Sequence, residues 1–375
     1  MKNKSLFLTL AMLTPLFISG CNPSEVTFTL NEPGEVDIHT DEQNAFWNDQ
    51  DMEKSLLQYG SGEENKEKPN PVKLSWKVTR AKTYTVNVSE NEDMSDAWHL
   101  ESKKKEYDLY NCKTGTKYYW TVTAHYSKVE HTSQVGTFTI KAGGPRNIYI
   151  DGVNNVRDIG GYVTNGGKTV KQGLIYRTAK MNESSVATPT MTITEKGIKT
   201  ATEQLKIKTD IDLRKVEKDS DGVDEIGGIT KSPLGESVNY VNCPMYYDGS
   251  SVIAHTTSAK DATNKENIKK MFDVLAVRDN YPVAFHCTQG KDRTGALAYL
   301  METLLDMKTT DIYHDYLFTN MSQIGGYCAY KAFAGYDYYL NQQEGSNLSQ
   351  KAYNYLLSIG VSATNIDSFI SIMTE

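Results

Sequence analysis

Hydrophobic and polar positions alternate in short runs between residues 70 and 141. In the first run Leu74, Trp76 and Val78 fall on one face, separated by polar residues. The same alternation returns at 84–88, 116–124 and 136–140. A period of two residues is typical of strands with one buried face, and turn-forming residues separate the runs. The sequence therefore predicts an all-β sandwich over residues 70–141.

The periodicity changes after an Ala-Gly-Gly-Pro linker at residues 142–145. Short apolar runs now alternate with longer segments of helical period. These runs and segments are, in chain order, 209–213, 264–278, 282–286, 295–307 and 309–375. Strands that alternate with helices predict a mostly parallel sheet surrounded by helices. We therefore expect a second domain, of the α/β class, over residues 146–375.

Residues 21–69 show no sustained period. They are polar and acidic, with Gly-Ser-Gly at 60–62 and a charged run at 63–68. Such a composition disfavours a packed core, so we expect part of this segment to be a mobile linker. The alternating residues 26–30 could form a first strand.

The first residues form a separate segment. Lys2 and Lys4 precede an apolar run, Leu6–Ile18, that is too short to span a bilayer comfortably. This composition predicts a signal peptide over residues 1–20. Its end, Ile-Ser-Gly-Cys, resembles a bacterial lipobox, which implies a lipid on Cys21. We expect an exported protein, lipid-anchored to a bacterial membrane on the periplasmic side or the cell surface. An ordinary signal peptide with a chance cysteine is the alternative.

Composition limits the partners and cofactors. The net charge of −7 argues against a nucleic-acid-binding protein, which would be basic. None of the five cysteines shows a CxxC spacing, so we expect no metal and no cofactor. Export would permit a disulfide among Cys112, Cys243 and Cys328, and free buried cysteines fit equally well.

The strongest chemical signal is the run His-Cys-Thr-Gln-Gly-Lys-Asp-Arg-Thr-Gly at residues 286–295, between an apolar strand and an apolar helix. Backbone N–H groups in such a loop can form an anion-binding nest, and the following helix adds its positive end. Arg293 supplies a planar fork for phosphate oxygens. We therefore predict a phosphate-binding loop made by Thr288, Gln289, Gly290, Lys291, Asp292, Arg293 and Thr294.

The same positive loop would stabilise a thiolate on Cys287. A thiolate can attack phosphorus and form a cysteinyl-phosphate, which water then hydrolyses. The hydroxyl of Thr294 could hydrogen-bond the sulfur and make it a better leaving group. We therefore predict Cys287 as the nucleophile and Arg293 as the second catalytic residue.

Three other interpretations of this run compete. Cys287 could be a buried structural cysteine, but Lys291, Asp292 and Arg293 lie within six residues of it. A nucleotide P-loop is excluded, since Phe285 and Asp292 occupy a required glycine and a required Ser/Thr position. A rhodanese-type sulfur transferase also uses a cysteine in such a loop. The Gly-Lys-Asp-Arg-Thr-Gly continuation favours phosphatase chemistry.

The run resembles the loop of the secreted bacterial tyrosine-phosphatase family, also called atypical dual- or triple-specificity phosphatases. Further segments that resemble the family are 155–162, 173–179, 208–214, 311–316 and 356–361. The resemblance covers residues 146–375 and implies a cysteine-phosphatase fold. Separately, the early tryptophan Trp76 and the Thr-x-Tyr at 116–118 make residues 70–141 resemble a fibronectin III or immunoglobulin-like domain.

The general acid is less clear from the sequence. The family protonates the leaving oxygen with an aspartate, and no Trp-Pro-Asp is present. Asp292, inside the loop, and Asp212, on a strand expected beside residues 283–285, are equal first candidates. Asp248 follows. Asp212 could instead be a structural partner of Arg214, and Arg157 and Asp158 are expected to hold neighbouring loops.

Three functions remain open. The leading one is a phosphatase with broad specificity for phosphotyrosine proteins and peptides. The second is a phosphoinositide or inositol-phosphate phosphatase, because Lys291 adds a second positive charge at the phosphate. The third is a non-catalytic receptor for phosphorylated ligands, which would not need a complete Cys-x5-Arg loop. The expected partners are therefore the phosphorylated substrate and, through the anchor, a membrane.

Overall fold

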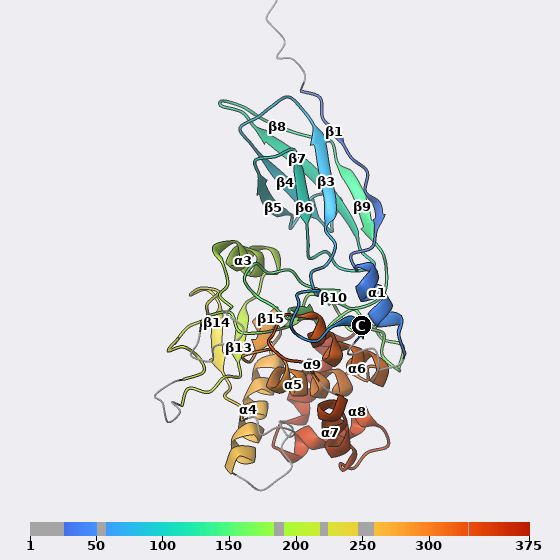
Figure 1. Cartoon of the computed structure of the whole chain (residues 1–375), viewed down its shortest axis with the longest axis vertical. Helices are drawn as coiled ribbons and strands as arrows, with labels where there is room; N and C mark the ends of the chain where they lie inside the picture. Colours follow the sequence, from blue (N-terminus) through green and yellow to red (C-terminus); the bar gives the residue numbers. More distant parts are fainter. Residues whose placement is uncertain (1–25, 51–57, 184–190, 218–223, 247–258, 329) are drawn as a thin grey trace, which may run out of the picture.

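The computed structural model describes residues 26–50, 58–183, 191–217, 224–246, 259–328 and 330–375. The predicted signal peptide and Cys21 lie outside the described residues. The molecule is elongated, with a β-rich N-terminal unit at one end and a C-terminal unit of sheet and helices at the other (Figure 1). None of the described helices is long and apolar enough to span a bilayer.

The N-terminal unit contains two β-sheets, with strand orders β1-β3-β6 and β2-β9-β7-β4-β5, and β8 pairs with β7. The strands are β1 (Thr29–Leu30), β2 (Gly34–Val36), β3 (Val72–Lys77), β4 (Thr83–Ser89), β5 (Trp98–Ser102), β6 (Glu106–Leu109), β7 (Lys117–His125), β8 (Glu130–Thr132) and β9 (Gly136–Ile140).

The two sheets share one hydrophobic core. Trp76 from β3 and Trp120 from β7 are both buried in it, together with Val86 from β4. Along β3, buried and exposed residues alternate strictly, which is the pattern that the sequence predicted. The hydroxyl of the buried Tyr118 accepts a hydrogen bond from the Lys113 N–H at 2.8 Å. The prediction of a β-rich N-terminal unit is therefore confirmed.

The C-terminal unit is built on a six-stranded sheet of order β10-β11-β12-β15-β13-β14. Its strands are β10 (Arg146–Asn147), β11 (Arg157–Asp158), β12 (Ile175–Thr178), β13 (Thr209–Asp212), β14 (Asn239–Asn242) and β15 (Val283–His286). The last four pair in parallel, whereas β10 and β11 are antiparallel additions at one edge. The prediction of a mostly parallel sheet is confirmed.

Helices cover both faces of this sheet. They are α3 (Glu195–Lys199) with its continuation η1 (Thr200–Gln204), α4 (Ala259–Leu275), η2 (Arg278–Asn280), α5 (Asp292–Leu304), α6 (Thr309–Phe318), η3 (Thr319–Met321), α7 (Tyr330–Asn341), α8 (Leu348–Ser358) and α9 (Ala363–Met373). In β15, Val283 and Phe285 face the core shared with α4–α9, and Ala284 faces the core beside α3 and η1. A strand covered on both faces is apolar throughout, as residues 283–285 are.

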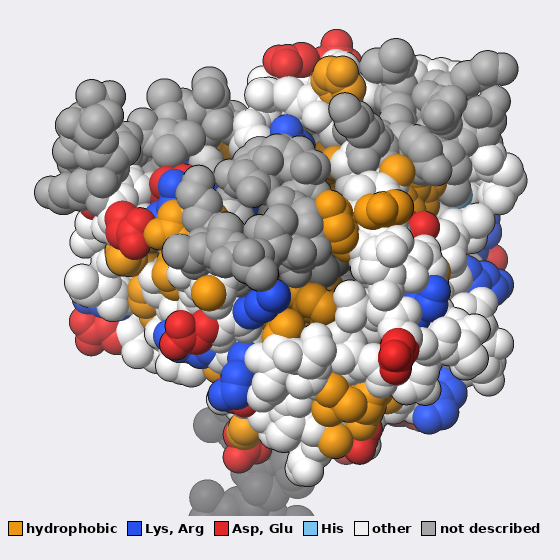
Figure 2. Space-filling view, turned by 90° about the horizontal axis from the view of Figure 1, so that it is seen from below, with side chains coloured by type: hydrophobic (Ala, Val, Ile, Leu, Met, Phe, Trp, Pro, Cys, Tyr) orange, Lys and Arg blue, Asp and Glu red, His pale blue; other side chains and the backbone are white. Residues whose placement is uncertain are grey.

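The surface far from the N-terminal unit is chemically mixed. In the described part of this face, hydrophobic side chains form small separate groups among polar ones (Figure 2). The exposed Val277, Tyr338 and Leu357 lie on different helices or turns of the C-terminal unit. Scattered exposed hydrophobic residues of this kind are ordinary on the surface of a folded protein.

The described residues of the segment 26–69 belong to the fold, including the Gly-Ser-Gly at 60–62, which we had expected in a mobile linker. β2 pairs in parallel with β9, and α1 (Asp41–Asn48) follows a capping box made by Thr40 and Gln43. Phe46 is 2% exposed and belongs to the core of the C-terminal unit. Trp47 stacks on Phe318 of α6 with ring centroids 4.9 Å apart. The adjacent aromatic residues Phe46 and Trp47 in this polar segment were the sequence signal for a buried helix, and the sequence analysis overlooked them.

Buried polar contacts join the two units beyond the Ala-Gly-Gly-Pro linker. Arg146 is 2% exposed and its Nη1 donates to the main-chain oxygen of Asn111 at 2.8 Å. The Asn111 side chain in turn bonds both the N–H and the carbonyl oxygen of Tyr149, at 2.8 and 3.0 Å. The chain therefore enters the C-terminal unit through a fixed connection.

Candidate active site

The loop of residues 287–293, called here the Cys287 loop, joins the central strand β15 to helix α5. β15 lies between β12 and β13, so its carboxyl end is flanked by a strand on each side. Cys287 follows this end directly, and α5 begins at Asp292. The first N–H groups of α5 therefore lie at the loop, where a helix favours an anion.

The carbonyl groups of the loop are held from outside. Three hydrogen bonds do this: Lys180 N–H to Thr288 O at 3.0 Å, Asn155 Nδ2 to Gln289 O at 2.9 Å, and Arg177 Nη2 to Gly290 O at 3.0 Å. In a planar trans peptide the next N–H points opposite to the carbonyl. The N–H groups of Gln289, Gly290 and Lys291 therefore point to the inside of the loop, as an anion nest requires.

Gly290 is required at its position for two reasons. Its φ of +67° lies in the left-handed region, which other residues adopt at a cost. A Cβ at this position would also lie 2.5 Å from the main-chain oxygen of Thr178 on β12. The loop can approach β12 this closely because residue 290 has no side chain.

A buried ionic cluster supports the loop from behind. Arg177 and Arg157 both pair with the carboxylate of Asp315 on α6, and all three side chains are fully buried. Burial by itself raises the pKa of Asp315, but the two guanidinium groups outweigh it and lower the pKa. Asp315 thus stays ionised and orients Arg177 toward the Gly290 carbonyl. Removing one partner of such a cluster would leave an uncompensated buried charge.

Asp158 fixes the turn that leads into β12. Its carboxylate accepts from Arg146 Nη2 at 2.6 Å and from the N–H groups of Gly160 and Gly173 at 2.9 and 2.6 Å. Arg157 and Asp158 therefore hold neighbouring segments, in agreement with the sequence analysis.

The environment of Cys287 favours the thiolate. Cys287 is 3% exposed, and burial alone would raise the pKa of its thiol. The charge of Arg293 and the polar groups of the neighbouring Thr294, its hydroxyl and its N–H, outweigh burial, so the pKa is lowered. Within the described residues the buried Thr294 hydroxyl has no hydrogen-bond partner, so no other group competes for it when the thiolate forms.

We expect iodoacetate to inactivate the protein with a pH midpoint below that of a free cysteine, about 8.5. The alkylation rate follows the thiolate fraction, so a lowered pKa brings the rate to its plateau at a lower pH. Measuring inactivation rates across pH, with vanadate as a protecting anion, checks this. Thr294→Val keeps the shape but removes the hydroxyl, and should raise the midpoint. A wild-type midpoint at the free-cysteine value would contradict this account.

Arg293 is held by Glu225, a residue that the sequence analysis missed. Arg293 Nη1 donates to Glu225 Oε2 at 2.6 Å, while Nη2 lies 3.4 Å from Thr288 Oγ1 in the loop. Burial by itself raises the pKa of Glu225, but Arg293 and the Lys215 N–H outweigh it and lower the pKa. The ionised carboxylate thus anchors one end of the fork and leaves the other end at the loop.

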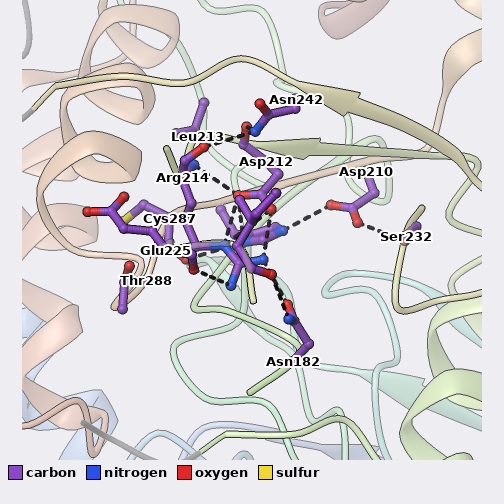
Figure 3. Close-up of polar contacts among 12 residues, drawn as sticks. Asn182, Asp210, Asp212, Leu213, Arg214, Glu225, Ser232, Asn242, Cys287 and Thr288 are labelled. Carbon is purple, nitrogen blue, oxygen red and sulfur yellow. Dashed lines mark hydrogen bonds and ion pairs between the residues drawn. The ribbon is translucent and has the colours of Figure 1, made fainter. Parts of the chain in front are cut away.

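Asp212 lies on β13 beside β15, where the sequence placed it, but its contacts are structural. Arg214 donates to both its oxygens, at 2.9 Å from Nε and 2.7 Å from Nη2, and Tyr240 donates at 2.9 Å. Figure 3 shows Asp212 and Arg214 turned toward each other. Burial raises the pKa of Asp212 by itself, but His286 and Arg214 outweigh it and lower the pKa. An ionised, fully bonded carboxylate is a poor proton donor, so the geometry disfavours Asp212 as the general acid.

His286 is buried between two carboxylates directly before Cys287. Its Nε2 lies 3.2 Å from Asp210 Oδ1 and its Nδ1 lies 3.8 Å from Asp212 Oδ1. Burial lowers the pKa of His286 by itself, but the two aspartates outweigh it and raise the pKa. The two aspartates therefore favour the protonated form of His286, which lies at the end of β15 next to the nucleophile.

Asp292 is the remaining first candidate for the general acid. It is the first residue of α5, its side chain is 18% exposed, and Lys291 Nζ lies 3.7 Å from its Oδ2. Unlike Asp212, it lies in the Cys287 loop and reaches solvent. Asp248 lies outside the described residues.

The remaining cysteines are buried and separate, so no disulfide joins Cys112, Cys243 and Cys328. Burial raises the pKa of the Cys243 and Cys328 thiols to about 12. Among the described residues, Cys287 is the cysteine whose pKa is lowered. No group of three or more His, Cys, Asp or Glu side chains in the described ranges could hold a metal ion.

A cysteine at the end of the central strand, a loop of inward N–H groups and an arginine at the next helix define a cysteine-phosphatase domain. Residues 148–328 match the model of the Tyrosine phosphatase family. The C-terminal half of this chain therefore contains a tyrosine phosphatase family domain.

Individual relatives are distant. A tyrosine-protein phosphatase of Nostoc commune is 38% identical over 53 residues, which is 14% of this chain and 18% of that protein. Among solved structures, the core catalytic domain of the PP-IP phosphatase SIW14 from S. cerevisiae is 15% identical, with a TM-score of 0.27 over 48% of this chain and 84% of that one. P. aeruginosa TpbA in complex with pTyr is 14% identical, with a TM-score of 0.27 over 51% of this chain and 88% of that one.

Proposed function

We propose that this protein hydrolyses phosphate monoesters through a cysteinyl-phosphate intermediate on Cys287. The observation that carries the proposal is the geometry around Cys287: the N–H groups of the loop point to its inside and Arg293 Nη2 lies at the loop, where the thiol has a lowered pKa. A purely structural cysteine would gain nothing from either feature.

In the first step the Cys287 sulfur attacks phosphorus, an S–P bond forms, and the ester P–O bond breaks. Asp292 gives a proton to the leaving oxygen, so the alcohol or phenol departs neutral. In the second step water attacks phosphorus and gives a proton to Asp292, the S–P bond breaks, and inorganic phosphate and the thiolate are released. The N–H groups and Arg293 stabilise the charge on the phosphoryl oxygens throughout.

For the substrate we propose phosphotyrosine proteins and peptides with broad specificity. The inositol-phosphate alternative rests on Lys291, whose side chain is 18% exposed in the loop and could contact a second phosphate. A non-catalytic receptor is disfavoured, because binding alone has no need of an activated thiol.

The substrate preference is tested by comparing kcat/KM of the purified protein for a phosphotyrosine peptide and for soluble inositol phosphates. We expect kcat/KM for the peptide to be higher by about tenfold or more, a difference of about 1.4 kcal/mol in transition-state binding. The reverse order would establish the inositol-phosphate alternative. Tight binding of the peptide without any turnover would establish the receptor.

We also propose that the protein is exported, lipidated at Cys21 and held at a bacterial membrane, with the N-terminal unit as a fibronectin III or immunoglobulin-like spacer. The leader composition supports the anchor. The core tryptophan Trp76 on the early strand β3 and the Tyr118 hydroxyl bonded to the Lys113 N–H support the domain type. Loss of membrane association in Cys21→Ser would support lipidation, and unchanged association would contradict it.

A further inference from the structure

Residues 58–68, called here the strap, precede the N-terminal β-strand β3 but lie against the C-terminal unit. The strap runs along residues 320–326, which comprise the end of η3 and the turn after it. Four backbone hydrogen bonds join them: Gly62 N–H to Asn320 O at 2.9 Å, Lys66 N–H to Met321 O at 2.7 Å, Ile324 N–H to Gly62 O at 2.9 Å, and Gly325 N–H to Gly62 O at 3.0 Å. The two segments therefore form one fixed layer.

The approach of the two backbones depends on glycine. A Cβ on Gly60 would lie 2.2 Å from the main-chain oxygen of Asn320. A Cβ on Gly62 would lie 2.1 Å from the main-chain oxygen of Gly326, and Gly62 also has a φ of +79°. The Gly-Ser-Gly that suggested a mobile linker thus permits a close contact instead.

The strap reaches the Cys287 loop by two routes. In the first, Gln289 Nε2 donates to the main-chain oxygen of Ile324 at 2.9 Å, and the Ile324 N–H is bonded to Gly62. The second route passes through the buried carboxyl group of Glu67. Ser322 Oγ donates to Glu67 Oε2 at 2.5 Å and also lies 3.3 Å from Asn155 Oδ1. The Asn155 Nδ2 in turn donates to Gln289 O at 2.9 Å.

Glu67 is 6% exposed, and burial raises the pKa of its carboxyl group against the opposing effect of Ser322 and of the N–H groups of Asn155 and Val156. Through the Ser322 hydroxyl, Glu67 is therefore linked to Asn155, whose side chain holds the Gln289 carbonyl. A buried polar group with several partners fixes those partners in one arrangement.

We propose that the strap positions the Cys287 loop, and that Glu67 is a positioning residue for the reaction on Cys287. The catalytic unit then includes residues on the N-terminal side of the β unit, and a chain beginning at residue 146 lacks part of it. This inference rests on the proposed function, because it assigns a role relative to the nucleophile.

The test compares Glu67→Ala, Glu67→Gln and wild type in the full chain. For Glu67→Ala we expect kcat on p-nitrophenyl phosphate to fall about 10- to 100-fold, as for small misplacements of catalytic groups. Vanadate should protect Cys287 from iodoacetate less well, and the pH midpoint of inactivation should rise. Glu67→Gln keeps the size and an acceptor oxygen, so all three measurements should stay within about threefold of wild type.

Glu64→Ala is the matched control, since Glu64 is a strap carboxylate that is 73% exposed, and it should leave all three measurements unchanged. If Glu67→Ala does not fold, Ser322→Ala removes the hydrogen-bond donor and keeps the carboxyl group. A folded Glu67→Ala or Ser322→Ala chain with wild-type kcat, vanadate protection and pH midpoint would overturn the proposal. Absence of turnover in wild type would instead refute the proposed function, while vanadate protection and the midpoint would still report the loop geometry.

Discussion

Cys287→Ser is expected to abolish turnover of p-nitrophenyl phosphate while the protein keeps its fold and its affinity for vanadate. A serine hydroxyl in the same place is a far weaker nucleophile than a thiolate, because its proton is lost only at much higher pH. The inward N–H groups and Arg293 do not depend on the sulfur, so the anion site should survive. Initial rates, a thermal melt and a vanadate titration are the measurements.

Cys112→Ser is the matched control for the nucleophile. It makes the same chemical change at a buried cysteine of the N-terminal unit, where burial keeps the pKa of the thiol well above its usual range. Its activity should stay within about threefold of wild type, because Cys112 lies in the core of the N-terminal unit, apart from the Cys287 loop, and distant substitutions act independently. Substantial activity in a folded Cys287→Ser chain would refute the cysteinyl-phosphate mechanism.

Arg293→Lys is expected to lower kcat/KM by about 2–4 kcal/mol in transition-state stabilisation, which is roughly 30- to 1,000-fold. The guanidinium keeps Nη1 on Glu225 at 2.6 Å while Nη2 points into the loop. A lysine has one nitrogen on a flexible chain, so it cannot hold Glu225 and a phosphoryl oxygen in the same fixed geometry. The loss should appear mainly in kcat, since the charge itself remains.

Steady-state kinetics on p-nitrophenyl phosphate, with the melting temperature measured in parallel, check this result. Arg80→Lys provides the control, because Arg80 is exposed in the N-terminal unit. Its kinetics should match wild type. An Arg293→Lys chain within about threefold of wild type would assign Arg293 a structural role, since oxyanion donors normally contribute far more.

The sequence alone determined the features that depend on near neighbours along the chain. Alternating positions in β3 and β7 define which side chains face the core, because successive residues of a strand point to opposite faces. The Cys287 loop was predictable for the same reason. Its nucleophile, its glycine and its arginine lie within seven consecutive residues, and a strand before it and a helix after it settle its shape.

The choice between two candidate acids needed the structure. Asp212 and Arg214 are two residues apart, which allows a pair without requiring one. Only the buried geometry shows both Asp212 oxygens bonded to Arg214. Asp292, by contrast, lies in the Cys287 loop, and its side chain is 18% exposed to solvent.

The residues that hold the site were decided by the tertiary structure alone. Glu225 is separated from Arg293 by 68 positions, Asp315 from Arg157 by 158, and Glu67 from Ser322 by 255. A single charged residue in a polar segment belongs to no periodic pattern and to no motif. The neighbouring sequence therefore does not show whether that residue is exposed to solvent or buried against a partner. Its role appears only when the strand order and the path of the strap place its partner beside it. The sequence thus specified the reacting groups, and the fold specified what keeps them in position.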